Sequence, residues 1–424
     1  APWVIYANQS EPFKRVKTVD VGVFPINIQM YDEDGKAEGI LAYQMTKFIQ
    51  KNASKMPHYS KVVFKPHNHG VLRGELNTFT GFKAKRLPGG QAAYPDVIAP
   101  FFDHIKKVWA NNDETIYNYL IKWLSVVVQK PWERTNTFIL LTGSQGCGKG
   151  VPCEFLINRI FGTHCAADCA GLSKVTQRFN SMLSGKVFLN VNEMSDVNSK
   201  NFYANFDKLK ALTTDSHLCV ERKGMPVSHV DNCLNMIGCS NQRHTVNKEK
   251  GCRRILALEC TDEFVGNFSY FDRLVKSLAE PETADHIITF LYDHESDVNL
   301  KRIPETALNK ELVESSLQPP LRFLNELDEY LECKRNERCD SGYHDESDYY
   351  KKYVREADKL ISKDKLYEWF KNWADSCREK VCSRAVFYKQ LRPRITKSRP
   401  TIEGKRVWCL VVSGPEQDTS GVAS

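Results

Sequence analysis

No uncharged apolar run in the chain approaches the roughly 18 residues that a membrane helix needs, so the sequence predicts no integral membrane protein. The first residues, APWVIYANQSEPFKRV, lack the basic stretch followed by an apolar one that marks a secretory signal. They also lack an initiator Met, which suggests that the chain is a piece of a longer protein. We therefore expect an intracellular protein without a membrane partner.

Paired Cys-x-x-Cys motifs with zinc spacing are also absent, although the chain contains 14 cysteines. Dense disulfides are typical of small secreted chains, whereas 424 residues with 42% hydrophobic side chains are enough to bury a core. Reduced thiols are therefore the expectation. A structural zinc stays open at the two nearest candidate groups, which are Cys165 and Cys169 beside His164, and Cys333 and Cys339 with His344.

Positive charge is in small excess, with a formal net charge of +7. Its distribution is uneven, because the segment from Arg378 to Arg406 holds ten Lys or Arg against two Glu, whereas 280–348 is rich in Asp and Glu. Charge runs are most often solvated surface, yet a basic C-terminal end favours a polyanion partner. At roughly 150 residues per domain, the length allows two or three domains.

Three short apolar runs bounded by polar residues predict buried strands in the middle of the chain, at 138–141, 187–191 and 234–238. Helical patterns lie between and after them, which indicates an α/β unit with a parallel sheet. Ahead of the first run, 101–130 has a helical pattern in which Asp113 is a candidate N-cap.

The sequence GSQGCGKG at 143–150 follows the first predicted strand and matches G-x-x-x-x-G-K in the strand–loop–helix context that the motif requires. Its glycines let backbone N–H groups surround a phosphate at a helix N-terminus, and Lys149 can bridge the β- and γ-phosphates of ATP. A chance Gly-rich turn is the alternative. The residues expected to contact ATP are Gly143, Ser144, Gln145, Gly146, Cys147, Gly148, Lys149, Gly150 and Val151.

One position departs from this motif. The residue after the lysine is usually Ser or Thr, whose hydroxyl binds Mg²⁺, and here it is Gly150, followed by Val151 and Pro152. The usual hydroxyl ligand is therefore missing. Either waters or other side chains hold the Mg²⁺, or nucleotide binding is weak.

Polar residues close the second and third predicted strands. Glu193 is expected to orient the attacking water, and Asn192 to be a ligand or polar partner of the Mg²⁺ shell. Both residues are expected to contact the Mg²⁺ indirectly; a helix-capping pair is the alternative. Asn241 is a candidate sensor of the γ-phosphate, although an Asn at a strand end is often only a turn residue. Arg253 or Arg254 is a candidate arginine finger that acts across a subunit interface, against a surface arginine pair.

The C-terminal part has predicted helices at 365–377 and 384–392, then a predicted hairpin that ends in 406–412. Helices followed by a hairpin, all in a basic segment, suggest a winged helix-turn-helix. Its expected DNA contacts are Arg384, Lys389, Arg392 and Arg394.

The order of these motifs resembles that of superfamily 3 helicases of the AAA+ class, and more narrowly that of the poxvirus- and phage-type primase-helicases. The resemblance covers about residues 60–400. Phosphate loops of this family also have Gly at the position of Gly150, usually with Thr next, so Val151 is a departure. Further matching segments are 74–82 (GELNTFTGF), 123–131 (WLSVVVQKP), 209–213 (LKALT), Glu221 with Lys223, Arg253 with Arg254, and 304–306 (PET).

This resemblance implies a hexameric ring with ATP and Mg²⁺ between subunits, and a β-hairpin ahead of the third strand that grips one DNA strand. The segment 218–229 fits the hairpin, with Lys223 and Gly224 at its tip. Lys223 is expected to contact DNA phosphate. Lys210, also among the expected DNA contacts, is expected near the subunit interface, within reach of the neighbour's nucleotide. Ordinary surface lysines are the alternative for both.

The first 95 residues show no cluster of paired acids, or of Cys and His, that would predict a primase. A primase or polymerase is therefore expected upstream or as a separate protein. The predicted organisation is an α+β N-terminal region at 1–95, a helical collar at 96–131, an AAA+ phosphate-loop ATPase core with a parallel sheet at 132–303, a linker and helical segment at 304–359, a winged-helix-like domain at 360–413 and a disordered tail at 414–424. Within 304–359, the stretch from Pro304 to Pro320 is the predicted linker, and a helix is predicted at 321–332.

The sequence thus predicts an ATP-hydrolysing replicative DNA helicase of a virus, phage or mobile element, whose ring translocates on single-stranded DNA and opens forked DNA. Two other classes stay open: an initiator or packaging ATPase that does not separate strands, and a degenerate ATPase that acts as a DNA-binding scaffold. An RNA helicase is a third possibility, because pore contacts read backbone charge more than the sugar.

Overall fold

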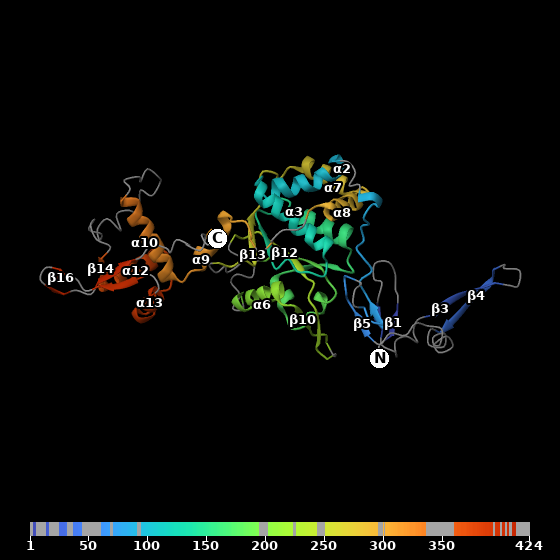
Figure 1. Cartoon of the computed structure of the whole chain (residues 1–424), viewed down its shortest axis with the longest axis horizontal. Coiled ribbons are helices and arrows are strands. Elements are labelled where there is room, and N and C mark those ends of the chain that lie inside the picture. Colours follow the sequence, from blue (N-terminus) through green and yellow to red (C-terminus); the bar gives the residue numbers. More distant parts are fainter. Residues whose placement is uncertain are drawn as a thin grey trace, which may run out of the picture. The chain divides into compact units, whose positions relative to one another are not determined.

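The computed structural model describes the chain over 61–67, 71–90, 95–194, 202–223, 226–243, 251–295, 300, 302–335 and 360–392. It divides into two compact units, Ala1–Lys310 and Glu311–Ser424, which are described separately below (Figure 1). Beyond these ranges it gives the backbone of short strands, which are β1 (Trp3–Ile5), β2 (Lys14–Val16), β3 (Pro25–Tyr31), β4 (Ala37–Gln44), β15 (Ile395–Ser398), β16 (Thr401–Ile402), β17 (Lys405–Arg406) and β18 (Cys409–Val412).

The first unit is built on a five-stranded, fully parallel sheet in the order β13-β7-β12-β9-β8. Every residue of β7 and β12 is buried, as expected for parallel strands covered on both faces. The three predicted strands are confirmed, and the parallel sheet with them. The strand bounds are β7 (Phe138–Thr142), β8 (Ala166–Ala170), β9 (Phe188–Asn192), β12 (Asn235–Ser240) and β13 (Ile255–Glu259).

A layer of helices covers one side of this sheet. It contains α2 (Pro95–His104), continued by a π-helical turn at Ile105–Trp109, and α3 (Glu114–Gln129), α7 (Phe268–Ala279) and α8 (Thr283–Asp293). Figure 1 shows these helices gathered together, away from α6 (Phe202–Thr214). The predicted N-cap is confirmed, because Asp113 Oδ1 accepts hydrogen bonds from Thr115 N at 2.8 Å and Ile116 N at 3.0 Å.

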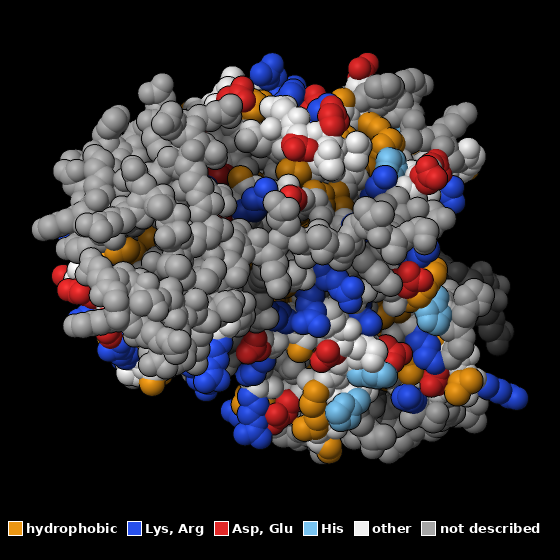
Figure 2. Space-filling model, turned by 60° about the vertical axis from the view of Figure 1, so that its left-hand side comes forward, with side chains coloured by type: hydrophobic (Ala, Val, Ile, Leu, Met, Phe, Trp, Pro, Cys, Tyr) orange, Lys and Arg blue, Asp and Glu red, His pale blue; other side chains and the backbone are white. Residues whose placement is uncertain are grey.

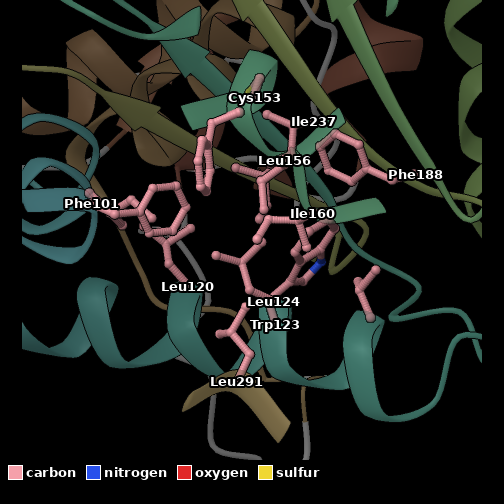
Figure 3. Close-up of a cluster of buried hydrophobic side chains, with 14 of the residues drawn as sticks. Phe101, Leu120, Trp123, Leu124, Cys153, Leu156, Ile160, Phe188, Ile237 and Leu291 are labelled. Carbon is pink, nitrogen blue, oxygen red and sulfur yellow. The ribbon is translucent and has the colours of Figure 1, made fainter. Parts of the chain in front are cut away.

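The main hydrophobic core lies between the helical layer and the sheet. Figure 3 shows Leu120 and Leu124 of α3 beside Phe101 of α2 and Leu291 of α8. Trp123 is fully buried, and its Nε1 donates to Thr137 O at 3.2 Å, just ahead of β7. The apolar side chains of α2 and α3 therefore pack the helical layer against β7, the strand that leads into the glycine-rich loop.

Shorter elements complete the first unit. After the loop come α4 (Gly150–Phe155), a π-helical turn at Leu156–Phe161, α5 (Leu172–Thr176) and a 3₁₀ turn at Ser181–Leu183. The strands β10 (His217–Val220) and β11 (Ser228–Asp231) form an antiparallel hairpin, which confirms the hairpin predicted at 218–229. Near the N-terminus, β5 (Lys61–Val63) pairs with β6 (Glu75–Asn77), and a 3₁₀ turn spans Pro88–Gly90.

The second unit has its own core of aromatic side chains, including Phe323, Phe370, Trp373 and Phe387. These residues come from α10 (Pro319–Arg335), α12 (Lys363–Ser376) and α13 (Arg384–Leu391). The predicted helices at 365–377 and 384–392 are confirmed. A three-stranded antiparallel sheet in the order β14-β18-β15 accompanies them, with β14 at Leu360–Ser362.

The stretch between Pro304 and Pro320, predicted as a linker, contains the helix α9 (Ala307–Ser316), which spans the boundary between the two units. Thr306 Oγ1 donates to Ala257 O at 2.8 Å, and Asn309 Oδ1 accepts from Ala257 N at 3.1 Å, so the start of α9 is bonded to β13. Within the described part of the chain, no helix has the length and apolar character needed to span a membrane.

Candidate functional site

The glycine-rich loop runs from the end of β7 into the start of α4, as its motif predicts. Gly146 and Gly148 have φ of 84° and 99°, in the left-handed region that favours glycine. A Cβ on Gly148 would lie 2.7 Å from His104 Cε1 and 2.9 Å from Phe271 Cε1. The backbone can therefore pass this point only without a side chain, which explains the second glycine of the motif.

Lys149 is almost fully buried at the foot of this loop. Its Nζ donates to Gly143 O at 2.7 Å and to Ser144 O at 2.8 Å. Ser144 is also held by Asp262, whose carboxylate accepts from Ser144 N at 3.2 Å and from Ser144 Oγ at 2.7 Å. The loop thus has a defined shape with a positive charge enclosed in it.

A cavity of about 640 Å³ opens at the carboxyl edge of the sheet. In open α/β sheets this edge is where ligands bind, because loops and helix N-termini converge there. Nine residues predicted from the sequence line this cavity, namely Gln145, Gly146, Gly148, Lys149, Gly150, Val151, Asn192, Glu193 and Asn241. Other lining residues are Glu154, Ile157, Asn158, Asp168, Asn190, Cys239 and Ser240.

Glu193 follows directly after β9 and is exposed to the cavity. Its φ of 52° is uncommon for a residue with a side chain, and such conformations cluster at functional sites. The next residue, Met194, is hydrogen-bonded to the sheet again, because its N donates to Cys239 O on β12 at 3.1 Å. The backbone therefore presents Glu193 at a tight turn over the strand end.

Asn241 follows β12, which lies between β7 and β9. The turn is fixed by Ser240 Oγ, which donates to Met194 O at 3.0 Å and accepts from Gln242 N at 3.0 Å. Asn241 consequently leaves the sheet between the glycine-rich loop and Glu193. The pairing of β12 with β7 places the strand of Asn241 beside the strand that carries the glycine-rich loop.

Arg253 and Arg254 do not join the cavity. Phe138 N donates to Arg254 O at 2.8 Å, which places this pair beside the amino end of β7, whereas the loop follows its carboxyl end. Five strand residues at about 3.3 Å each separate the two ends. Both arginines are exposed, so the finger role stays a prediction that requires a second copy of the chain.

The predicted DNA contacts lie elsewhere. Lys223 is exposed in the turn of the β10–β11 hairpin, and its neighbour Gly224 lies outside the described residues. Lys210 on α6 has its Nζ 4.9 Å from the centre of the Phe206 ring and 3.5 Å from Asp207 Oδ1.

In the second unit, Lys389 and Arg392 are exposed on and just after α13. Arg384 pairs with Asp364 and lies 5.9 Å from the rings of Tyr367 and Tyr388. The predicted DNA contact Arg394 is outside the described residues.

Two side chains beside the loop have shifted acidities. His104 is fully buried, its Nε2 donates to Gly148 O at 3.0 Å, and its Nδ1 accepts from the Tyr270 hydroxyl at 2.8 Å. Burial lowers the pKa of His104, so the ring is neutral at pH 7. A hydrogen bond with the Cys260 thiol, together with the charge of Lys149, lowers the pKa of the Cys147 thiol to about 6.

No group of three His, Cys, Asp or Glu side chains with metal-site geometry occurs among the described residues. At the first zinc candidate, Cys165 Sγ donates to Phe161 O at 3.0 Å, and His164 Nε2 donates to Gly81 O at 2.7 Å. The second candidate lies beyond the side chains that the structure describes.

Sequence reasoning missed Asp168, Glu154 and Asn158 as residues of the cavity. Asp168 lies on β8, a strand that the sequence did not predict because AADCA has neither an apolar run nor β-branched residues. The spacing of Glu154 could have predicted its place in the cavity, because it lies one helical turn after Gly150 and therefore on the same face of the helix. Asn158, another turn along, shares that face.

Comparison with known proteins finds similarity in sequence and in structure, and one match includes the glycine-rich loop. A family of unknown function, DUF5906, matches residues 141–254, from the end of β7 to the start of β13. The DNA primase-polymerase of Nitratiruptor phage NrS-1 is 32% identical over 142 residues, which make up 34% of this chain and 19% of that protein. The chain is therefore similar to a phage primase-polymerase over about a third of its own length, which spans about a fifth of the relative's length.

Solved structures extend the likeness over most of the chain. The apo structure of the NrS-1 C-terminal region has a TM-score of 0.61 at 18% identity, covering 89% of this chain and 92% of that one. The A form of the same region gives a TM-score of 0.60 at 17% identity, with 89% and 93% covered. At this identity the likeness establishes a shared α/β fold.

Proposed function

We propose that this chain is the ATP-hydrolysing motor of a phage-type DNA helicase. The observation that carries the proposal is one cavity at the carboxyl edge of the sheet, lined by Lys149 of the loop together with Glu193 and Asn241 from two strand ends. A volume of about 640 Å³ is within the ordinary range for small-molecule sites. The relationship to a phage primase-polymerase supports a role in DNA replication.

The chemistry follows from the residues that line the cavity. Backbone N–H groups of the loop and the start of α4 bind the phosphates, and Lys149 exchanges its loop carbonyls for phosphate oxygens. Glu193 accepts the proton of the attacking water, and Asn241 donates to the γ-phosphate or to this water. When bound, Mg²⁺ supplies neutralisation of the developing charge, and the oxygen donors of this cavity suit it.

Strand separation requires the predicted assembly. In the proposed ring, Lys223 at the hairpin turn contacts DNA phosphate, and Arg253 or Arg254 reaches the nucleotide of the adjacent subunit, which agrees with their distance from the loop of their own chain. Figure 2 shows a small group of Lys and Arg side chains side by side near the middle of the face in view, with Asp, Glu and His side chains around it. Such a group can attract a polyanion.

The test uses Glu193→Gln, because this change keeps the side-chain size but removes the proposed base. We expect the variant to bind ATP normally and to lose hydrolysis by about 100-fold or more. Fluorescent nucleotide binding and phosphate release measure the two properties. Normal turnover in the variant would overturn the assignment of the site.

A second candidate function is favoured by Gly150 and Val151. Val151 packs against the main core, so the position after Gly150 offers an apolar side chain where a hydroxyl would serve the metal. This favours an ATPase or scaffold that binds DNA without separating strands. Unwinding of forked DNA, with an RNA fork in parallel, discriminates: separation of the DNA fork supports the helicase, whereas hydrolysis without separation supports this second candidate.

A further inference from the structure

Both residues that usually hold the metal in phosphate-loop NTPases are replaced in this chain. The metal in such proteins is held by the Ser or Thr after the loop lysine and by an Asp at the end of a neighbouring strand. Here these positions carry Gly150, which has no side chain, and Asn192, whose amide is uncharged. Glu193 is already assigned to the attacking water.

The structure places another carboxylate, that of Asp168, beside Asn192, where the usual metal-holding Asp is missing. Asp168 lies on the edge strand β8, and its Cα is in register with that of Asn190 on β9. Because side chains two residues apart on a strand share a face, Asn190 and Asn192 both point toward the side on which Asp168 lies. All three line the cavity of the glycine-rich loop.

Hydrogen bonds show how this carboxylate is held. Asn192 Nδ2 lies 2.8 Å from both Oδ1 and Oδ2 of Asp168, and Asn190 Nδ2 donates to Oδ1 at 2.8 Å. The side-chain oxygen Oδ1 of Asn192 accepts from Asn190 Nδ2 at 2.9 Å, and Oδ1 of Asn190 accepts from the Cys239 thiol at 3.7 Å. Asn190 itself is buried. The two amides therefore orient Asp168 as a fixed unit.

This arrangement leaves Asp168 available for a cation. A carboxylate has about four lone-pair sites, and the two amides take three contacts at most. Amide donors are neutral, so they fix the carboxylate without cancelling its charge. Within the described residues no Lys or Arg pairs with Asp168, and its side chain is exposed to the cavity. Mg²⁺ in nucleotide sites uses one or two carboxylates and keeps several waters.

We propose that Asp168 is the carboxylate that holds the nucleotide-bound Mg²⁺, and that Asn190 and Asn192 are its positioning residues. This inference depends on the proposed function, because it concerns the metal that accompanies ATP in the same cavity. It divides the two acidic tasks between neighbouring strands: Asp168 on β8 serves the metal, and Glu193 after β9 serves the water.

The experiment measures affinity rather than turnover. The full chain and its Asp168→Asn variant are titrated with the non-hydrolysable analogue AMP-PNP, once with Mg²⁺ and once with EDTA. We expect Mg²⁺ to tighten binding by wild-type protein, and Asp168→Asn to lose about 10- to 100-fold of this gain while its affinity in EDTA stays unchanged. Binding of Mn²⁺ followed by electron paramagnetic resonance should weaken in parallel.

Three further variants sharpen the result. Asp215→Asn changes an exposed carboxylate outside the cavity and should keep the full metal effect. Glu154→Gln tests another carboxylate that lines the cavity. If this variant, and not Asp168→Asn, lost the gain in affinity that Mg²⁺ gives, the proposal would be overturned. Lys149→Ala should weaken binding both with and without metal.

Other outcomes separate the two proposals. An unchanged metal effect in Asp168→Asn would overturn the Asp168 assignment and leave the ATP site standing. Equal loss with and without metal would also overturn it, because Asp168 would then only hold the sheet edge together. Wild-type protein without affinity for AMP-PNP under either condition would overturn the proposed function and this inference together.

Discussion

His104 ties the glycine-rich loop to the helical layer through one buried ring. Its Nε2 donates to the carbonyl of Gly148, and its Nδ1 accepts from Tyr270 on α7. This pattern requires the neutral ring with its proton on Nε2, because a carbonyl oxygen cannot donate. Burial, which lowers the pKa of His104, keeps the ring in that form.

The lowered pKa predicts a loss of stability in acid. The unfolded chain takes up a proton at this histidine below about pH 6.5, whereas the folded chain resists it until its lower pKa is reached. The unfolded state then binds more protons, so the free energy of unfolding falls as the pH drops from about 6.5 through the folded-state pKa. Urea unfolding at pH 7.5 and pH 5.5 measures this for wild type and His104→Asn.

The comparison isolates His104 because His294, whose pKa burial also lowers, is present in both proteins. We expect the drop in stability between the two pH values to be smaller in His104→Asn. An equal drop in both proteins would contradict the assignment of a neutral, buried His104.

At the level of helices, α3 carries the layer that supports the loop, and its first turn depends on Asp113. The Asp113 carboxylate satisfies two backbone N–H groups that have no partner within the helix. We expect Asp113→Ala to lower the free energy of unfolding by about 1 kcal/mol, measured by urea denaturation. Asp113→Asn is the matched control, because Asn is an equally good N-cap. A loss of the same size in Asp113→Asn would mean that the cap bonds are not the cause.

The elements with strong local signals were predictable. Apolar runs identified β7, β9 and β12, and the helical period with its cap identified α3. β8 was not predictable, because AADCA has neither an apolar run nor β-branched residues. The helix α9 was also missed, since its flanking prolines resemble linker punctuation. Its bonds to β13 become visible only in the folded chain.

The same contrast holds within the candidate site. Lys149, Glu193 and Asn241 belong to motifs with fixed spacing along the chain, so the sequence could place them at one edge of the sheet. Asp168 reaches that edge only through the register of β8 with β9, and no sequence spacing encodes that register. Its proposed role depends on amide contacts from Asn190 and Asn192. The sequence predicted Asn192 for the Mg²⁺ shell, whereas Asn190 lies inside an apolar run that gave no sign of a polar function.

At the scale of the whole molecule, the chain contains two units with separate cores. The candidate ATP site lies in the first unit, and three of the four predicted winged-helix contacts, Arg384, Lys389 and Arg392, lie in the described part of the second. Domain bounds, ring formation and DNA contacts therefore remain predictions about how these units work together. The helicase proposal requires that the first unit is a working ATPase.

Steady-state ATP hydrolysis with Mg²⁺, measured with and without single-stranded DNA, tests this requirement most directly. We predict turnover that DNA stimulates in wild-type protein and that is lost by about 100-fold or more in Lys149→Ala, because the buried ammonium at the foot of the loop is removed. Turnover that persists in Lys149→Ala, or no turnover in folded wild-type protein with DNA present, would contradict the account.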